Sequence, residues 1–199
     1  MIIHNVKQSS FEWLNLRAGR FTGTDAQAVA EGKKGLQTAA LAKAAYLLTG
    51  NLPGAFETPV MQAGQEREPQ ARKAYEEYTG RPVQTVGFVE LDEYTGCSPD
   101  GLVGDDGLIE IKCKQDKAHL YTVLTGKIDP AHRAQIQFQM LVCGRKWCDY
   151  VCFNPMFKNP LYVKRVYAHG EDQAALAKGL AAGRELVKQY INQYKEAYL

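Results

Sequence analysis

Three charged residues in the middle of the chain, Asp100, Glu110 and Lys112, have the types and spacing of a metal-dependent hydrolytic site. Side chains of a β-strand alternate between its faces, so Glu110 and Lys112 share one face of a strand predicted over 108–113. Two carboxylates beside an ammonium group suit Mg²⁺ or Mn²⁺ rather than zinc, which prefers His and Cys. Such an ion polarises a phosphoryl oxygen and acidifies bound water. The residues therefore predict metal-dependent phosphodiester hydrolysis.

Asp100 lies on the same face as Glu110 and Lys112 only if the turn between Asp100 and Glu110 has the right length. The segment Asp105-Asp106-Gly107 fits a three-residue hairpin loop with its glycine in the left-handed position. That register places Asp100 opposite Lys112 and diagonal to Glu110 on one face, with the two acidic residues about 7–8 Å apart at the backbone. A two-residue loop would place Asp100 on the opposite face. Lys112 would orient the attacking water, take its proton if the lysine pKa is lowered, or neutralise transition-state charge.

These residues resemble the PD-(D/E)xK nuclease motif, written here as Ser98-Pro99-Asp100-Gly101 and Glu110-Ile111-Lys112. Three further segments agree with one family of such nucleases: Leu16-Arg17-Ala18-Gly19 followed by Thr22-Gly23-Thr24, Gly64-Gln65-Glu66-Arg67-Glu68-Pro69 with Ala71, and Ala134-Gln135-Ile136-Gln137. Together they span residues 16–137 in the order found in the lambda-exonuclease-like (YqaJ-type) viral recombination nucleases. The combination is far more specific than any single segment.

The resemblance implies an alkaline, Mg²⁺-dependent exonuclease in which Mn²⁺ substitutes. Such an enzyme degrades one strand of linear double-stranded DNA in the 5′→3′ direction from a 5′-phosphorylated end. It leaves a 3′ single strand for homologous recombination. The resemblance further implies a restriction-endonuclease-like core and a ring-shaped homotrimer, and it allows a single-strand annealing recombinase as partner.

The same resemblance assigns roles by position. The metal ligands would be Asp100, Glu110, the backbone carbonyl of Ile111, and Glu68 directly or through water. Lys112 would be the catalytic lysine, and Gln135 would place it or the attacking water. The 5′-phosphate of the DNA would be bound by Arg17, Thr24 and Ser98. The chain departs from the family pattern at Lys114, where a proline is frequent, and at His132, where a tyrosine is common.

Alternatives remain open on the sequence alone. The Asp-Glu-Lys set also serves endonucleases and single-strand nucleases, since one fold supports many cutting patterns. A non-catalytic DNA-binding or recombination scaffold is a third hypothesis. Glu68 could be an exposed helix carboxylate, Gln135 could belong to a solvated helix face, and Arg17 could be a surface arginine.

The surrounding sequence predicts the elements that position these residues. Helices are expected from a Ser9–Glu12 capping box, after a Thr24 N-cap over 25–31, over 38–48, from Thr58-Pro59 to Gly80 with a kink or restart at Pro69, from Asp129-Pro130 to about Cys143, and at the C-terminus. Strands are expected over 83–91, 102–103, 108–113, 147–153 and 161–168. This order predicts an α/β (α+β) fold with a central mixed β-sheet flanked by helices.

Length and composition place these elements in one nuclease domain over 1–199, with a helical region over 1–80, a sheet core over 81–168 and a C-terminal helix over 170–198. The first dozen residues lack the apolar core of a signal peptide, and no long apolar run is present, which predicts a cytoplasmic protein without a membrane span. The resemblance implies a bacterial host or a phage gene. The five cysteines lack zinc-site spacing, which favours reduced thiols.

The net charge of +2 hides an asymmetry. Residues 56–106 carry eleven acidic and four basic side chains, whereas residues 107–170 carry ten basic and four acidic ones. An acidic segment that gathers a divalent cation, next to a basic one that holds phosphate, would explain this division. The alternative is that the charges even out over the folded surface.

Overall fold

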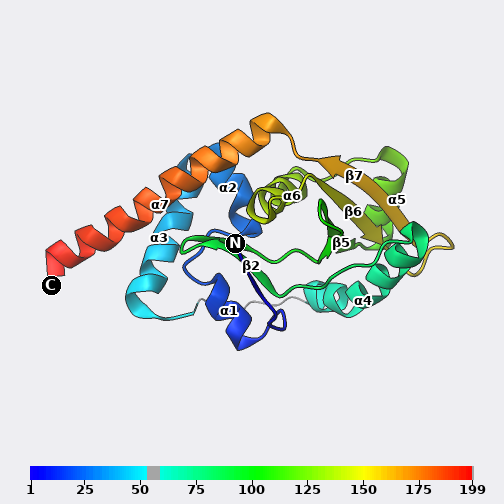
Figure 1. Ribbon diagram of the computed structural model, residues 1–199, viewed down its shortest axis with the longest axis horizontal. Coiled ribbons are helices and arrows are strands. Elements are labelled where there is room, and N and C mark those ends of the chain that lie inside the picture. Colours follow the sequence, from blue (N-terminus) through cyan, green and yellow to red (C-terminus); the bar gives the residue numbers. More distant parts are fainter. Residues whose placement is uncertain (53–58, 199) are drawn as a thin grey trace.

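The computed structural model describes residues 1–52 and 59–198 and contains two β-sheets (Figure 1). The smaller sheet is antiparallel and consists, in spatial order, of β1 (Ile2–His4), β2 (Phe88–Asp92) and β3 (Thr95–Cys97). The larger sheet is mixed and consists of β4 (Gly101–Val103), β5 (Gly107–Cys113), β6 (Trp147–Phe153) and β7 (Leu161–Tyr167). Its central pair, β5 and β6, is parallel, and the outer pairs are antiparallel.

Helices cover both faces of the larger sheet and extend beyond it. They are α1 (Phe11–Arg17), α2 (Ala26–Glu31), α3 (Lys34–Thr49), α4 (Pro59–Thr79), α5 (Asp116–Thr125), α6 (Pro130–Cys143) and α7 (Gly170–Tyr198), with a 3₁₀ turn, η1, at Gly23–Asp25. Among the described helices, none has the length and apolar character needed to cross a membrane. Figure 1 shows the long α7 running beside α2 and α3, away from the sheet.

Two hydrophobic clusters hold the larger sheet between α4 and α6. On one face, Ala71 and Tyr75 of α4 pack against Ile109 and Ile111 of β5. On the other face, α6 contributes Ile136, among other residues, to the main core. The predicted alternation along β5 is therefore correct: the isoleucines face α4, and Glu110 and Lys112 face α6.

The mixed α/β architecture predicted from sequence is confirmed, as are the strand over 147–153 and the helix after Asp129. The Asp129 side chain caps this helix by accepting a hydrogen bond from the Ala131 N–H at 2.8 Å. That helix ends at Gly144, which adopts a left-handed conformation with φ +62°. Other strong patterns match closely: the final strand ends at Tyr167, one residue earlier than predicted.

Several local predictions are wrong. The cap of α1 is Ser10, whose hydroxyl accepts from the Trp13 N–H, and not Ser9. Thr22 rather than Thr24 starts the next helical segment, because the Asp25 carboxylate accepts from the Thr22 N–H at 2.9 Å. Helix α4 continues through Pro69, so of the predicted kink or restart at this residue the restart is wrong. Thr58 lies outside the described residues.

Short elements escaped the sequence prediction. Strands β1 and β3 and helix α5 were not expected, and β1 lies inside the region predicted to be helical. Of the strand predicted over 83–91, only the portion from Phe88 onward is a strand in the sheet, although Gln84 forms an isolated bridge to Leu102. The short strands depend on pairing with distant segments, which local propensity does not encode.

A buried polar network ties α4 to the sheet and predicts a stability effect. The Tyr75 hydroxyl donates to Asp149 Oδ2 at 2.8 Å, and Arg165 binds the same carboxylate through two nitrogens at 2.8 Å each. We expect Tyr75→Phe to lower the free energy of unfolding by about 1.5–3 kcal/mol, the range for a hydrogen bond to a charged group. Urea denaturation measures the loss. Tyr78→Phe, at an exposed position of the same helix, is the control, and equal effects of the two substitutions would contradict the prediction.

Candidate active site

The hairpin between β4 and β5 brings Asp100 to the strand that carries Glu110, but in a different register from the predicted one. The observed partners are Gly101 with Ile109, Leu102 with Leu108, and Val103 with Gly107. The loop is thus Gly104-Asp105-Asp106, and Gly104, with φ +54°, takes the left-handed position assigned to Gly107.

Gly107 lies in β5, where it pairs with Val103 of β4 and Trp147 of β6. The Trp147 indole lies so close that a Cβ at Gly107 would stand 2.1 Å from that ring. The observed pairing of β4 with β5 is therefore shifted by two residues from the predicted one. A two-residue shift preserves which face each side chain occupies, so Asp100, which immediately precedes β4, still lies on the side of Glu110.

Glu110 is the buried centre of the site. The residue is 1% exposed, and its two carboxylate oxygens have different partners. Oε1 lies 2.5 Å from the Lys112 Nζ, and Oε2 accepts a hydrogen bond from Gln139 Nε2 at 2.8 Å. Lys112 Nζ also lies 3.4 Å from Gln135 Oε1. Since Gln135 and Gln139 are four residues apart on α6, one helix face supplies both amides.

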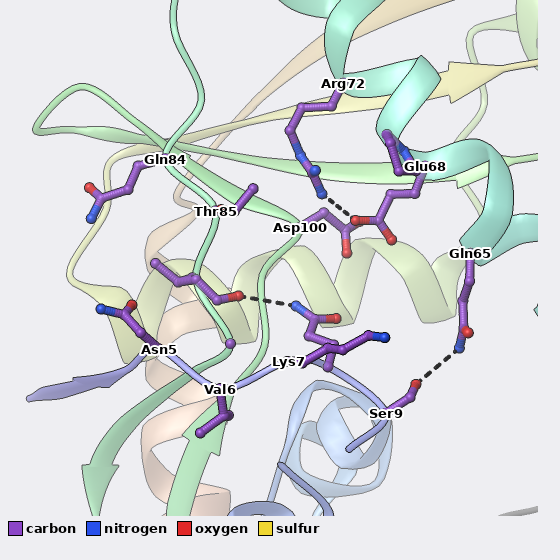
Figure 2. Close-up of a pocket in the computed structure, with 14 residues that line it drawn as sticks. Asn5, Val6, Lys7, Ser9, Gln65, Glu68, Arg72, Gln84, Thr85 and Asp100 are labelled. Atoms are coloured by element: carbon purple, nitrogen blue, oxygen red, sulfur yellow. Dashed lines mark hydrogen bonds and ion pairs between the residues drawn. The ribbon is translucent and has the colours of Figure 1, made fainter. Parts of the chain in front are cut away.

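Asp100 and Glu68 add two further carboxylates. Asp100 Oδ2 accepts from the Ile111 N–H at 2.6 Å, and Glu68 of α4 is paired with Arg72. Figure 2 shows the Glu68 and Asp100 side chains at the same end of a pocket of about 710 Å³, which the segment Asn5–Ser9 and α4 border. The acidic side chains are therefore reached from an open cavity.

The crowding of carboxylates shifts the pKa values of the site residues. Burial, followed by the charges of Glu110 and Glu68, raises the pKa of Asp100 well above its usual value. Burial also raises the pKa of Glu68, although Arg72 opposes the shift. Burial lowers the pKa of Lys112, but the carboxylates of Glu110 and Asp100 outweigh it, so the net pKa is raised and the side chain remains an ammonium. This result favours charge neutralisation or water orientation by Lys112 over proton abstraction.

The donor set fits a hard divalent cation. In the described part of the chain, no three His, Cys, Asp or Glu side chains are already grouped as a metal cage. Glu110, Asp100 and Glu68 each have a protein partner. Glu110 and Glu68 nevertheless raise the pKa of Asp100, and Glu110 raises that of Glu68, so a divalent cation would relieve this repulsion. Oxygen donors of this kind suit Mg²⁺ or Mn²⁺.

Trp13 links two of the residues assigned to the 5′-phosphate, Ser98 and Arg17. Ser98, two residues before Asp100, accepts a hydrogen bond from the Trp13 indole N–H at 2.8 Å. The Arg17 guanidinium stacks on the same indole, 4.3 Å from the ring centre, and burial lowers its pKa. Trp13 thus joins Arg17 to Ser98, a contact across 85 residues that the sequence did not reveal.

Thr24, the third residue assigned to the 5′-phosphate, shares a cavity with Arg17. It lies on η1 and lines, together with Arg17, a cavity of about 500 Å³. The neighbouring Gly23 packs on the Gln135 side chain, since a Cβ at Gly23 would stand 3.0 Å from Gln135 Cγ. The turn that carries Thr24 therefore touches the amide that contacts Lys112.

The structure brings together the predicted metal-site and lysine residues, places Arg17 and Thr24 at a separate cavity, and adds three residues that the sequence reasoning did not assign. Gln139 binds Glu110, Arg72 binds Glu68, and Trp13 supports Ser98. The four-residue spacing between Gln135 and Gln139 was an available signal, but it is also typical of a solvated helix face.

Comparisons with known proteins identify the family of the chain and similar solved structures. A family model, the YqaJ-like viral recombinase domain, matches residues 12–146. The alkaline exonuclease LHK-Exo from Laribacter hongkongensis is 32% identical, with a TM-score of 0.86 over 94% of this chain and 97% of that one. Its complex with dAMP gives the same 32% identity, TM-score of 0.86 and coverage of 94% and 97%. The search of curated proteins found no match.

A phage-related exonuclease from Haemophilus somnus 129PT shares the fold, with 17% identity and a TM-score of 0.67 over 91% of this chain and 99% of that one. The likeness to these structures agrees with the predicted restriction-endonuclease-like core. Because the family model covers most of the sequence and LHK-Exo is similar over nearly its whole length, this chain belongs to the YqaJ-like viral recombinase domain family.

Proposed function

We propose that the protein is a divalent-metal-dependent exonuclease that degrades one strand of linear double-stranded DNA. It acts in the 5′→3′ direction from a 5′-phosphorylated end and leaves a 3′ single strand for recombination. The observation that carries the proposal is the junction of Asp100, Glu110 and Lys112 beside the α6 amides. The similarity to an alkaline exonuclease solved with dAMP supports release of mononucleotides.

The metal would be Mg²⁺, with Mn²⁺ as a substitute. Asp100, Glu110, Glu68 and the Ile111 carbonyl would hold it, and when bound it would polarise the scissile phosphate and activate water. Lys112, as an ammonium, would neutralise charge that develops on the phosphate, and Gln135 would keep Lys112 and the attacking water in position. Gln139 would hold Glu110 in place.

Preference for a phosphorylated end would come from Arg17, Thr24 and Ser98. We expect Arg17→Ala to slow degradation of 5′-phosphorylated ends by about 10–100-fold, which corresponds to loss of one charge-assisted hydrogen bond. The same variant should digest phosphorylated and dephosphorylated ends at similar rates. Initial rates on the two substrates measure the ratio. Arg145→Ala, at a hairpin-side arginine that binds the Gly104 carbonyl, is the control. A preserved preference in Arg17→Ala would remove this role.

The proposed function is tested by the identity of the strand that disappears. Linear duplex with a 5′-phosphate on one strand only is incubated with and without Mg²⁺, and each strand carries a different label. Loss of the phosphorylated strand from its 5′ end, only with metal, supports the proposal. Cutting of covalently closed circular duplex would instead identify an endonuclease, and loss from the 3′ end would contradict the polarity.

The remaining elements of the proposal concern assembly and context. Residues 1–199 would act as one nuclease domain within a ring-shaped homotrimer that encloses duplex DNA. A single-strand annealing recombinase would receive the 3′ strand, in the cytoplasm of a bacterial host. Enclosure predicts that processivity depends less on salt than loading does, because loading relies on phosphate contacts.

A further inference from the structure

A third cavity, of about 840 Å³, is lined by residues of α5, the loop after it, the start of α6 and β7. Three lysines line it: Lys114 after β5, Lys127 in the loop between the helices, and Lys164 on β7. All three come from the basic segment 107–170. The cavity is separate from the pocket that Glu68 and Asp100 border.

The charge of these lysines is not cancelled by carboxylates. Lys114 Nζ donates to the Thr122 hydroxyl at 2.9 Å, and Lys164 Nζ donates to the Gly126 carbonyl at 2.7 Å. Over residues 1–52 and 59–198, Lys114, Lys127 and Lys164 form no ion pair. The cavity therefore carries net positive charge.

The other charged groups of the lining already have partners. Arg133 pairs with Asp172 and Arg165 with Asp149. Asp129, the acidic residue of the described lining, is engaged as the cap of α6 and accepts from the Ala131 N–H. The lysines are thus the groups available to an anion from outside.

Strand register relates this cavity to the catalytic residues. Glu110 of β5 pairs with Tyr150 of β6, which pairs with Lys164 of β7, so these three side chains form one row across one face. Two strand spacings separate the backbones of Glu110 and Lys164 by about 10 Å. Lys114 follows Lys112 by two residues and lines the cavity. This short segment therefore joins the catalytic lysine to the cavity.

The residues assigned to the two phosphates and the lysine cavity follow one another across the sheet. Ser98 and Asp100 stand before β4, Glu110 on β5 and Lys164 on β7. Tyr150, between Glu110 and Lys164, is buried, so a strand whose 5′-phosphate lies at Ser98 and whose scissile phosphate lies at Lys112 would reach the cavity at Lys114. We propose that the cavity lined by Lys114, Lys127 and Lys164 binds the phosphate backbone of the DNA beyond the scissile bond. This inference rests on the proposed function.

Salt dependence of DNA binding tests the proposal. Each phosphate contact that a lysine makes to duplex DNA contributes about 0.9 to the slope of log K against log salt concentration. We expect Lys127→Gln/Lys164→Gln to lower the magnitude of that slope by about 2 and Lys127→Gln alone by about 1. Binding of 5′-phosphorylated duplex is measured with Ca²⁺ in place of Mg²⁺, over a series of salt concentrations.

Matched variants keep the result interpretable. Lys178→Gln/Lys195→Gln removes the same charge from exposed positions of α7 and should leave the slope unchanged. Lys127→Arg/Lys164→Arg should retain it. A wild-type slope in Lys127→Gln would overturn the proposal, as would equal slopes in the cavity double variant and the α7 double variant. In either case, degradation of DNA at the wild-type rate would leave the proposed function intact. Failure of the wild-type protein to bind or degrade duplex would overturn both.

Discussion

Replacing Lys112 by methionine should lower the rate of DNA degradation by about 10²–10⁴-fold, the range for losing one group that supports proton transfer or charge in the transition state. Methionine keeps the unbranched stem but removes the ammonium that lies 2.5 Å from Glu110 Oε1. Because the 5′-phosphate residues and the lysine cavity are untouched, duplex affinity should remain close to that of the wild type. Single-turnover release of nucleotides and equilibrium binding measure the two effects.

Two further substitutions sharpen that experiment. Lys112→Arg should rescue little, because the guanidinium is larger and planar and cannot reproduce a compact ammonium between Glu110 and Gln135. Lys158→Met, at an exposed loop position, should be as active as the wild type. A Lys112→Met protein that binds DNA and degrades it at nearly the wild-type rate would exclude Lys112 from the chemistry.

The elements that local sequence predicts well are those with strong internal signals. Helix α6 has an acidic cap, a proline at its first position and a terminal glycine, and its predicted bounds match. Strand β6 is rich in strand-forming aromatic and β-branched residues, and its predicted bounds also match. In contrast, β1 has three exposed or half-buried residues and exists because it pairs with β2, more than eighty residues away.

The shared face of Asp100, Glu110 and Lys112 was predictable because side chains alternate between the two faces of a strand. Even an error of two residues in the hairpin register left Asp100 on the correct side. The surrounding contacts were not predictable in this way. Gln139 reaches Glu110 only after α6 packs on the sheet, and Trp13 reaches Ser98 only after α1 packs near β2. Such contacts require the tertiary arrangement.

The substitution Asp100→Asn should increase stability without metal and abolish activity. An acid whose pKa is raised by folding is harder to ionise in the folded state, so its charged form destabilises the protein at pH values above the unfolded-state pKa. Asparagine removes this charge, and its side-chain oxygen can still accept from the Ile111 N–H. The metal-free melting temperature at neutral pH should therefore be higher in the variant than in the wild type.

Added metal should reverse that order. If Asp100 is a ligand, Mg²⁺ at a hundred times its Kd stabilises the wild type by about 2.7 kcal/mol, which raises the melting temperature by about 5–10 °C. Asp100→Asn should show a much smaller rise and no degradation of DNA, while Asp105→Asn, in the exposed hairpin loop, should behave as the wild type in all three measurements. A full metal-induced rise in Asp100→Asn would mean that the ion binds elsewhere, whereas a metal-free melting temperature below that of the wild type would mean that the Asp100 charge stabilises the fold. The opposite signs expected with and without metal follow from one cause: Glu110 and Glu68 repel the Asp100 carboxylate, and a divalent cation would relieve that repulsion.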